Sequence, residues 1–187
     1  MPDPTRASEN DPIRPAPLTQ SLHAPWRLAY LETLTPDAAA KKAGSGSFLR
    51  DYWLNPAGDI TNHVVLRTGA GMILLNAFPY ANGHLLVALG EARSRLGDYT
   101  AEQRAALWAL TDRAAELMDR ALNPHGINIG VNQGAAAGAG VPTHLHVHLV
   151  PRWSGDVNFM ATVARVRILP ASLDHMAARY RKVLEGK

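Results

Sequence analysis

Short apolar runs separated by turn residues begin near residue 60. His63–Arg67 and Met72–Leu75 are rich in valine, isoleucine and leucine, and Thr68–Gly71 between them contains two glycines. This pattern predicts two strands joined as a hairpin. The following segment, Asn76–Gly83, contains a proline and ends in glycine, which predicts a turn. His84–Leu89 then predicts a third, short and apolar strand.

Two later stretches carry apolar residues at helical spacing. Thr100 and Gln103 match a capping box at the start of the first stretch, and Asn123-Pro124 gives it an end. The residues expected on its buried face are Leu107, Leu110, Ala114, Leu117, Met118 and Ala121. A second, C-terminal helix is expected to begin near Pro170. Its apolar positions are Leu173, Met176, Ala177, Tyr180 and Leu184.

Further strands are expected between and around these helices. Ile127–Val131 and His144–Val150 predict a strand pair, and Gln133–Pro142 between them predicts a loop rich in glycine and alanine. Val163–Ile168 fits a last strand. Because strands dominate before the long helix and a strand pair follows it, the chain is expected to be α+β, with a mostly antiparallel sheet.

The start of the chain differs in composition from the rest. Residues 1–24 contain five prolines, mixed charges and no apolar core of a secretory signal, so we expect a disordered arm. Trp26–Leu34 carries an apolar patch that is expected to dock on the core. Thr35–Ser47 is small, polar and rich in glycine and serine, which predicts a linker or loop. Residues 25–187 are thus expected to form a single domain.

Composition narrows the classes of function. With 47% hydrophobic and 19% charged residues the chain is typical of globular proteins, and it lacks the roughly 18 consecutive apolar residues of a membrane span. The net charge of +3 comes from scattered basic residues, which suits an anionic small molecule at least as well as nucleic acid. The absence of cysteine excludes disulfides, thiolate metal sites and cysteine nucleophiles. A cytoplasmic protein is the default expectation.

Three of the eight histidines fall within five residues. The run is Thr143-His144-Leu145-His146-Val147-His148-Leu149-Val150. Because successive side chains of a strand point to opposite faces, the three imidazoles are expected to share one face and the aliphatic residues the other. Adjacent imidazoles buried without partners would leave polar nitrogens unsatisfied. The imidazole face must therefore meet solvent, a metal or a ligand.

Three interpretations of this face compete. The first is a polar strand surface on which histidine happens to recur. The second is a metal site, but such sites generally add a carboxylate or another histidine, and the nearest following acid is Asp156, beyond Pro151. The third is nucleophilic catalysis, because a neutral imidazole attacks phosphorus well and its neighbours can manage protons and charge. We favour the third.

A glycine-rich loop leads directly into the histidine run. It contains Asn132, Gly134, Gly138 and Gly140. Glycines let the backbone approach a ligand closely, so amide N–H groups can point at phosphate oxygens. Such loops are also common as ordinary connections, and only the position before the histidines favours the functional interpretation. Amide donors and imidazoles are thereby expected around one phosphate.

These motifs resemble the histidine triad family. His144–Val150 matches the family signature of His, apolar, His, apolar, His and two apolar residues. Asn76, eight residues before His84, looks like the family's early strand pair, whose asparagine contacts the ribose region of the nucleotide. The resemblance covers roughly residues 60–155. It implies a histidine-triad-like fold, a homodimer and a nucleotide substrate.

Within that family, Pro151–Met160 and Asn76–Tyr80 are similar to the bacterial diadenosine tetraphosphate phosphorylase branch. The resemblance implies that His146 is the nucleophile and forms a nucleotidyl-histidine. It further implies that His148 hydrogen-bonds the α-phosphate and that His144 lies beside the bridging or leaving oxygen. Substrates of this branch are dinucleoside polyphosphates, here expected to contain adenine.

The resemblance also assigns binding residues. Asn132 corresponds to a polar residue near the phosphate or the nucleophile, and the amides around Gly138 and Gly140 would hold phosphate. Trp153 either lines the nucleotide pocket or packs as a structural residue. The charge of Arg152 is expected to stabilise the equatorial phosphate oxygens.

Two departures from the family are visible. Many relatives carry two cysteines near their start that help to bind zinc, whereas the matching region here, about Ser47–Arg50, has none, so no structural metal is expected. Relatives that hydrolyse dinucleotides usually carry a polar Gln or Ser shortly before the triad, where this chain has Gly140-Val141-Pro142-Thr143. The acceptor of the second step, water or inorganic phosphate, is therefore left open.

The sequence thus predicts an enzyme that cleaves a phosphoanhydride bond in a dinucleoside polyphosphate. No cofactor is required, although a divalent cation such as Mg²⁺ can accompany the nucleotide. Two alternatives stay open: a nucleoside phosphoramidase or mononucleotidyl hydrolase on the same scaffold, and a nucleotide-binding regulatory protein with little catalysis. Nucleic-acid and membrane partners are not expected.

Overall fold

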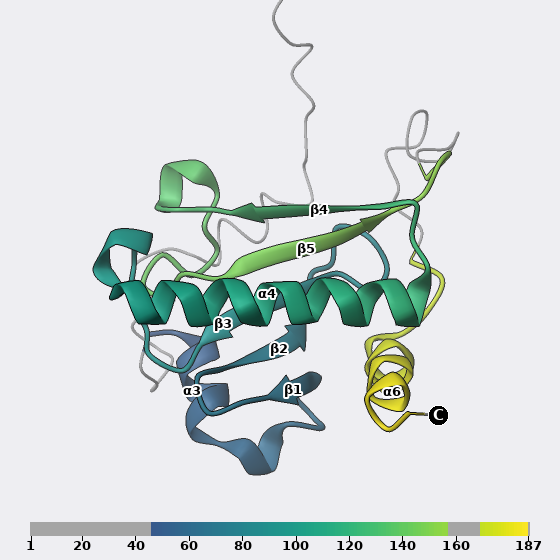
Figure 1. Cartoon of the computed structure of the whole chain (residues 1–187), viewed down its shortest axis with the longest axis horizontal. Helices are drawn as coiled ribbons and strands as arrows, with labels where there is room; N and C mark the ends of the chain where they lie inside the picture. Colours follow the sequence, from purple (N-terminus) through teal and green to yellow (C-terminus); the bar gives the residue numbers. More distant parts are fainter. Residues whose placement is uncertain (1–45, 157–168, 187) are drawn as a thin grey trace, which may run out of the picture. The chain divides into compact units, whose positions relative to one another are not determined.

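Strands that precede and follow the long helix α4 (Ala101–Leu122) in the sequence form one sheet, and α4 lies against one face of it (Figure 1). The computed structural model describes residues 46–156 and 169–186, and within these residues five strands pair antiparallel in the order β1-β2-β3-β5-β4. The strands are β1 (Val64–Arg67), β2 (Gly71–Leu75), β3 (Leu85–Leu89), β4 (Gly126–Val131) and β5 (Val147–Arg152). The helices are α3 (Phe48–Leu54), α4 (Ala101–Leu122) and α6 (Leu173–Leu184), with 3-10 turns η1 (Pro56–Gly58), η2 (Leu96–Asp98) and η3 (Ala135–Ala137). The predicted α+β class with an antiparallel sheet is confirmed.

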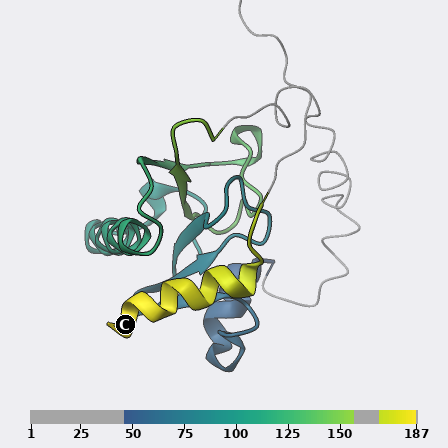
Figure 2. The ribbon, with the colours of Figure 1, turned by 90° about the vertical axis from the view of Figure 1, so that its right-hand side faces the viewer.

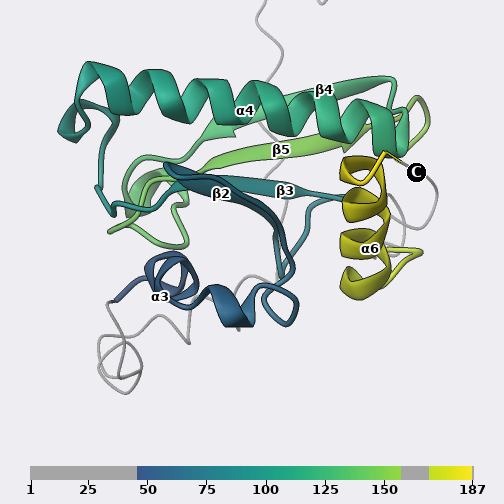
Figure 3. The same ribbon diagram turned by 60° about the horizontal axis from the view of Figure 1, so that its bottom comes forward.

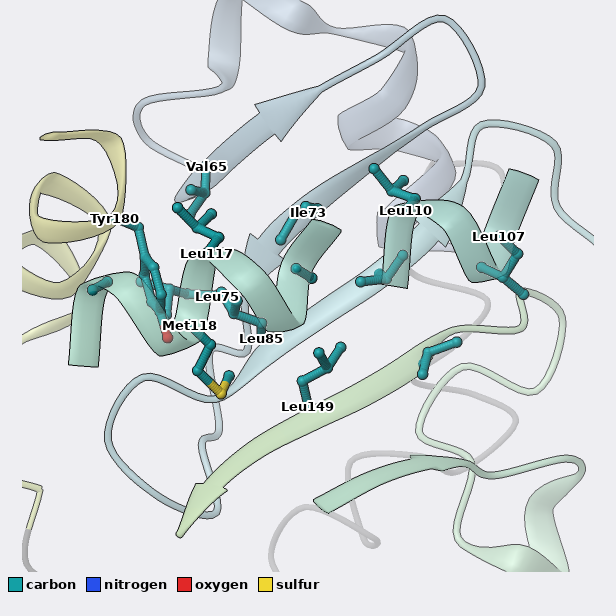
Figure 4. Close-up of a cluster of buried hydrophobic side chains, with 14 of the residues drawn as sticks. Val65, Ile73, Leu75, Leu85, Leu107, Leu110, Leu117, Met118, Leu149 and Tyr180 are labelled. Carbon is teal, nitrogen blue, oxygen red and sulfur yellow. The ribbon is translucent and has the colours of Figure 1, made fainter. Parts of the chain in front are cut away.

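The two faces of the sheet carry different layers, because side chains alternate along each strand. In Figure 3, α4 covers one face and α3 lies against the other. On the α4 face, residues such as Ile73, Val87 and Leu149 pack with α4 and α6 in the main core, part of which Figure 4 shows. On the α3 face, a smaller apolar cluster includes Leu49 and Leu86.

The long helix α4 begins and ends where the sequence predicts. Thr100 accepts from the Gln103 backbone N–H at 3.2 Å, and the Gln103 side chain accepts from the Thr100 N–H at 2.9 Å. Asn123, with φ of 47°, ends the helix in the left-handed conformation. All six residues expected on its inner face are buried. No helix in the described part of the chain is long and apolar enough to cross a membrane.

Helix α6 confirms the predicted C-terminal helix and runs crosswise to α4. In Figure 1 α4 is seen from the side and α6 end-on, whereas in Figure 2 α4 is seen end-on and α6 from the side. The Ser172 side chain accepts from the His175 N–H and caps the start of α6. Met176, Ala177 and Tyr180 are buried in the main core. The helix therefore closes the end of the core near the turn between β2 and β3.

The strand that carries the histidines begins later than predicted. The sequence predicted a strand over 144–150, whereas β5 runs from Val147 to Arg152. The backbone before Val147 bonds elsewhere: the N–H of His144 donates to Val141 O and that of Leu145 to Arg93 O. The sheet ladder starts only where Val147 pairs with Val87. His144 and His146 therefore precede the strand.

A short helix, α3, was not predicted. It directly follows the stretch that the composition assigns to a linker, and Ser47, the last residue of that stretch, caps it by accepting from the Arg50 N–H at 3.2 Å. The expected arm 1–24, the apolar patch 26–34 and the strand 163–168 all lie outside the described residues.

Candidate active site

Three histidines and a tyrosine meet on the α3 face of the sheet, where β3 lies beside β5. His148 lies on β5 opposite Leu86, and His84 directly precedes β3. The ring centroids of His146 and His148 are 4.8 Å apart, and those of His84 and His148 are 5.1 Å apart. Tyr80 stacks on His148 at 5.9 Å and 17°. The expected clustering of imidazoles thus holds for His146 and His148, with His84 in place of the third.

His144 has no free ring nitrogen. Its Nε2 donates to Leu89 O at 2.8 Å, because a carbonyl oxygen can only accept, and its Nδ1 then accepts from the Ser47 hydroxyl at 2.9 Å. The residue is completely buried. The sequence places His144 beside the leaving oxygen of the substrate; in this structure both ring nitrogens bond within the protein, and that role stays a prediction. His144 thus links the end of β3, through Leu89, to the N-cap of α3, Ser47.

The backbone of His144 fixes the protonation of His146. The Nδ1–H of His146 donates to His144 O at 2.9 Å. A neutral imidazole with its proton on Nδ1 keeps the lone pair on Nε2. His146 is buried, so this lone pair has little competition from bulk water. Its Nε2 therefore has the electronic form of a nucleophile.

A second hydrogen-bond chain fixes the protonation of His148. The Nδ1 of His84 accepts from the Tyr80 backbone N–H at 3.1 Å and from the Asn76 amide at 3.3 Å. His84 must then carry its proton on Nε2 and donate it to His148 Nδ1, 3.0 Å away. His148 in turn carries its proton on Nε2. That Nε2–H is buried and has no hydrogen-bond partner among the described residues, so it is a donor that awaits an acceptor.

Burial keeps these imidazoles neutral. Desolvation is the main cause that lowers the pKa of His144, His146 and His148, since a charged ring loses more hydration than a neutral one. The pKa of His148 falls from 6.5 to about 4, and the nearby His146 contributes to that shift. At neutral pH the site therefore holds one lone pair on His146 and one N–H donor on His148.

This shift makes stability depend on pH. Above about pH 6.5 His148 is neutral both folded and unfolded, but as the pH falls towards about 4 only the unfolded chain takes up the proton. Folding stability is thus lost on acidification, by up to about 3 kcal/mol from this residue. Urea unfolding at pH 7.5 and 4.5 is expected to show a smaller pH effect in His148→Asn than in the wild-type protein. An equal effect in both would contradict the assignment.

The side-chain amide of Asn76 is hydrogen-bonded within the protein. Its Oδ1 accepts from the Phe78 N–H at 3.0 Å, which directs Nδ2 towards His84. The sequence expected Asn76 to contact the ribose region of a nucleotide. In the structure its amide orients His84, and contact with a ribose stays a prediction.

The glycine-rich loop differs from the expected phosphate nest. Gly134 and Gly138 both have φ of +86°, which favours glycine. The Gly138 N–H donates to Ala135 O at 2.9 Å within the turn η3, and a phosphate contact from this amide stays a prediction. The Asn132 amide donates to Gly138 O at 3.4 Å and braces the same turn. Phosphate contacts from Gly134, Gly140 and Asn132 stay predictions.

Arg152 is already paired. Its guanidinium bonds both carboxylate oxygens of Asp156, at 2.6 and 3.0 Å, and the Asn128 side chain at 3.0 Å. The hydrogen-bonded Asp156 raises the pKa of Arg152, whose charge is thus largely compensated where it lies. Trp153 is half-buried and donates its backbone N–H to Asp156. A direct role of Arg152 or Trp153 towards a nucleotide stays a prediction.

The sequence interpretation missed Ser47 and His84 as site residues. His84 begins an apolar strand in the register of Leu86, so its face was predictable, but the pairing of β3 with β5 that brings it to His148 was not. Ser47 was assigned to a linker, and nothing local shows that it meets His144, 97 positions later. Within the described residues, no group of three or more His, Asp or Glu side chains is arranged to hold a metal ion.

Comparisons with known proteins agree with this geometry. A family model described as the HIT domain matches residues 57–155. AP-4-A phosphorylase of Mycobacterium tuberculosis is 34% identical over 163 residues, which cover 82% of this chain and 78% of that protein. The asymmetrical bis(5'-nucleosyl)-tetraphosphatase of Schizosaccharomyces pombe is 31% identical over 97 residues, 52% of this chain and 53% of that one.

The fold is also similar to that of a solved structure. The zinc-bound histidine triad family protein from Mycobacterium smegmatis aligns with a TM-score of 0.59 and 27% identity, over 73% of this chain and 93% of that chain. The histidine run and the sheet order agree with these similarities. The chain therefore belongs to the histidine triad (HIT) family.

Proposed function

We propose that this protein cleaves dinucleoside polyphosphates by two displacements at the α-phosphorus, through a nucleotidyl-His146 intermediate. The proposal rests on the protonation of two neighbouring imidazoles. His146 Nε2 carries a lone pair, and His148 Nε2 carries a proton that has no acceptor among the described residues. Phosphoryl chemistry needs both, because one group must attack phosphorus while another stabilises charge on its oxygens.

In the first step the Nε2 lone pair of His146 forms a bond to the α-phosphorus, and the bond from phosphorus to the bridging oxygen breaks. The departing nucleotide leaves with that electron pair. The ring of His146 gains positive charge, which the His144 carbonyl stabilises through the Nδ1–H. The Nε2–H of His148 donates to a non-bridging oxygen and stabilises the negative charge there.

In the second step an oxygen nucleophile attacks the same phosphorus and the N–P bond breaks, which returns the lone pair to His146. We propose inorganic phosphate as this acceptor, and the support is the similarity to a relative named AP-4-A phosphorylase. A phosphorylase converts diadenosine tetraphosphate and phosphate to ADP and ATP, whereas hydrolysis gives AMP and ATP. We expect Mg²⁺, where present, to accompany the polyphosphate.

Product analysis in ¹⁸O-labelled water tests this proposal. Diadenosine tetraphosphate with unlabelled phosphate is expected to yield ADP without label from water. AMP that carries ¹⁸O would instead identify water as the acceptor and overturn the phosphorylase assignment. Adenosine phosphoramidate serves as the comparison substrate, and a clear preference for it would favour the phosphoramidase alternative.

We further propose that the protein is a homodimer that associates through β4. In the sheet order β4 lies at one edge, so one side of its backbone has no partner strand among the described residues. The side chain of Ile129 on β4 is 46% exposed. An exposed edge with an apolar side chain favours pairing with another strand. Light scattering is expected to give twice the mass of 20.2 kDa, and Ile129→Lys to shift it towards the monomer.

A further inference from the structure

The C-terminal helix reaches the turn that presents His84. Tyr180 of α6 is completely buried, and its hydroxyl donates to Gly83 O at 2.7 Å. Gly83 is the residue directly before His84, 97 positions before Tyr180. Desolvation raises the pKa of Tyr180 far above its ordinary value, so the hydroxyl stays a donor at every working pH. The contact therefore joins two distant parts of the chain at a point next to the site.

Gly83 has no space to move towards the helices. Its φ of +86° belongs to the region that favours glycine, and a Cβ there would lie 2.5 Å from Leu122 Cδ1 and 3.0 Å from the Tyr180 oxygen. The backbone of the turn thus lies directly against α4 and α6. The hydrogen bond from Tyr180 prevents movement in the other direction, away from the helices.

The position of Gly83 affects His148 through His84, the residue that follows it. Its backbone donates to Ala81 O at 3.1 Å and accepts from the Asn76 N–H at 2.9 Å, so the turn is held at both ends. Its ring accepts from Tyr80 at Nδ1 and lies 3.0 Å from His148 at Nε2. A shift of Gly83 that moves His84 would change its contact with His148, and a hydrogen bond weakens steeply with distance and angle.

We propose that Tyr180 is a positioning residue for catalysis: its bond to Gly83 holds His84 in the place where His84 fixes the tautomer of His148. The kinetic consequence rests on the function proposed above, whereas the tautomer is a property of the free protein. Without the Tyr180 hydroxyl, His148 can lose its donor at Nδ1 and place its own proton there. Its Nε2 then carries a lone pair, which repels a phosphate oxygen instead of binding it.

The docking of α6 does not depend on the Tyr180 hydroxyl. The Arg179 side chain donates to Ala121 O at 2.7 Å, and Arg181 donates to Val64 O at 2.8 Å. His63 and Asp174 meet at 3.0 Å near the start of the helix. Removal of one oxygen from Tyr180, with its ring kept, is therefore expected to leave the helix in place.

Tyr180→Phe tests the proposal with two readouts. Imidazole ¹⁵N chemical shifts, which separate a protonated ring nitrogen from a lone-pair nitrogen, are expected to show His148 protonated at Nε2 in the wild-type protein and a mixture of tautomers in the variant. With diadenosine tetraphosphate as the probe, kcat is expected to fall about tenfold while KM changes less than about twofold, because only the fraction of molecules with the proton on His148 Nε2 stabilises the transition state.

Tyr99→Phe is the matched control. Tyr99 is also a buried tyrosine, 2% exposed, and its hydroxyl donates to the carbonyl of Glu91 at 2.9 Å. Both variants lose one buried hydrogen bond to a backbone carbonyl, so both are expected to lower Tm to a similar extent. Only Tyr180→Phe is expected to change the His148 tautomer and kcat.

A wild-type His148 tautomer and wild-type kcat in folded Tyr180→Phe would overturn the proposal. If circular dichroism shows that this variant is not folded, the wild-type ¹⁵N spectrum still tests the proposal, because a His148 proton on Nδ1 in the wild-type protein would overturn it. Failure of the proposed function is distinguishable: a wild-type protein that does not cleave the dinucleotide removes the kinetic readout, but the ¹⁵N measurement still decides the role of Tyr180.

Discussion

His146→Asn is expected to lower kcat for diadenosine tetraphosphate by about 10⁵-fold or more, because the variant loses the atom that bonds to phosphorus. Asparagine keeps a similar polar volume in the buried position. Nucleotide affinity, measured by isothermal titration calorimetry with a non-hydrolysable analogue, is expected to stay within a few-fold of wild type.

The control for this variant is His175→Asn, which changes an exposed histidine of α6. Its kcat is expected to match the wild type. Near-normal turnover in His146→Asn would reject His146 as the nucleophile, since no other described imidazole next to His148 combines burial with a free lone pair fixed on Nε2.

His148→Ala is expected to lower kcat by about 10² to 10³-fold, the usual effect of removing one preorganised donor to transition-state charge. His84→Ala is expected to cost nearly as much. His84 acts through His148, because its Nε2–H is what keeps the His148 proton on the side of the substrate. The double variant should therefore be no slower than His148→Ala alone.

Steady-state kinetics of the two single variants and the double variant measure this coupling. Multiplicative losses, with the double variant slower than His148→Ala by the full His84 factor, would show that His84 acts independently. Tyr99→Phe again serves as the control for a buried hydrogen bond of similar kind outside the histidine pair.

The alternation of apolar and polar residues predicted the sheet face of His148 correctly, because that rule depends only on local strand geometry. It could not predict the partners of His144, whose environment is non-local. Residues before Val147 bond to Val141 and Arg93 instead of the β3 ladder. The His144 ring is held by Leu89 and Ser47, and no local pattern reveals that partnership.

The long helix was predictable in detail because its signals are local: a capping box, a 3.6-residue apolar period and an αL residue at its end. The short helix α3 has 7 residues, too few for a helical apolar period to be recognised, and its cap, Ser47, lies in a stretch with linker composition. The turn η3 shows the same limit. Glycines predict unusual backbone angles, but they do not say whether the amides face a ligand or, as for Gly138, the turn itself.

The His84 chain shows what a sequence cannot supply. Asn76 and Tyr80, from the turn between β2 and β3, hydrogen-bond His84, and Tyr180 of α6 hydrogen-bonds its neighbour Gly83. Each residue alone has an ordinary structural explanation. Only their convergence, which needs the antiparallel pairing of β3 with β5 and the docking of α6, fixes which nitrogen of His148 carries a proton.

Trapping of the covalent intermediate tests the central claim most directly. The protein is mixed with diadenosine tetraphosphate without inorganic phosphate, quenched in alkali, where N–P bonds of histidine survive, and analysed by peptide mass spectrometry. The result we expect is one adenylate on the peptide that contains His146, absent from His146→Asn. Continued turnover with no adduct, together with inversion of configuration at a chiral phosphorothioate, would instead mean a single direct displacement and would contradict the account.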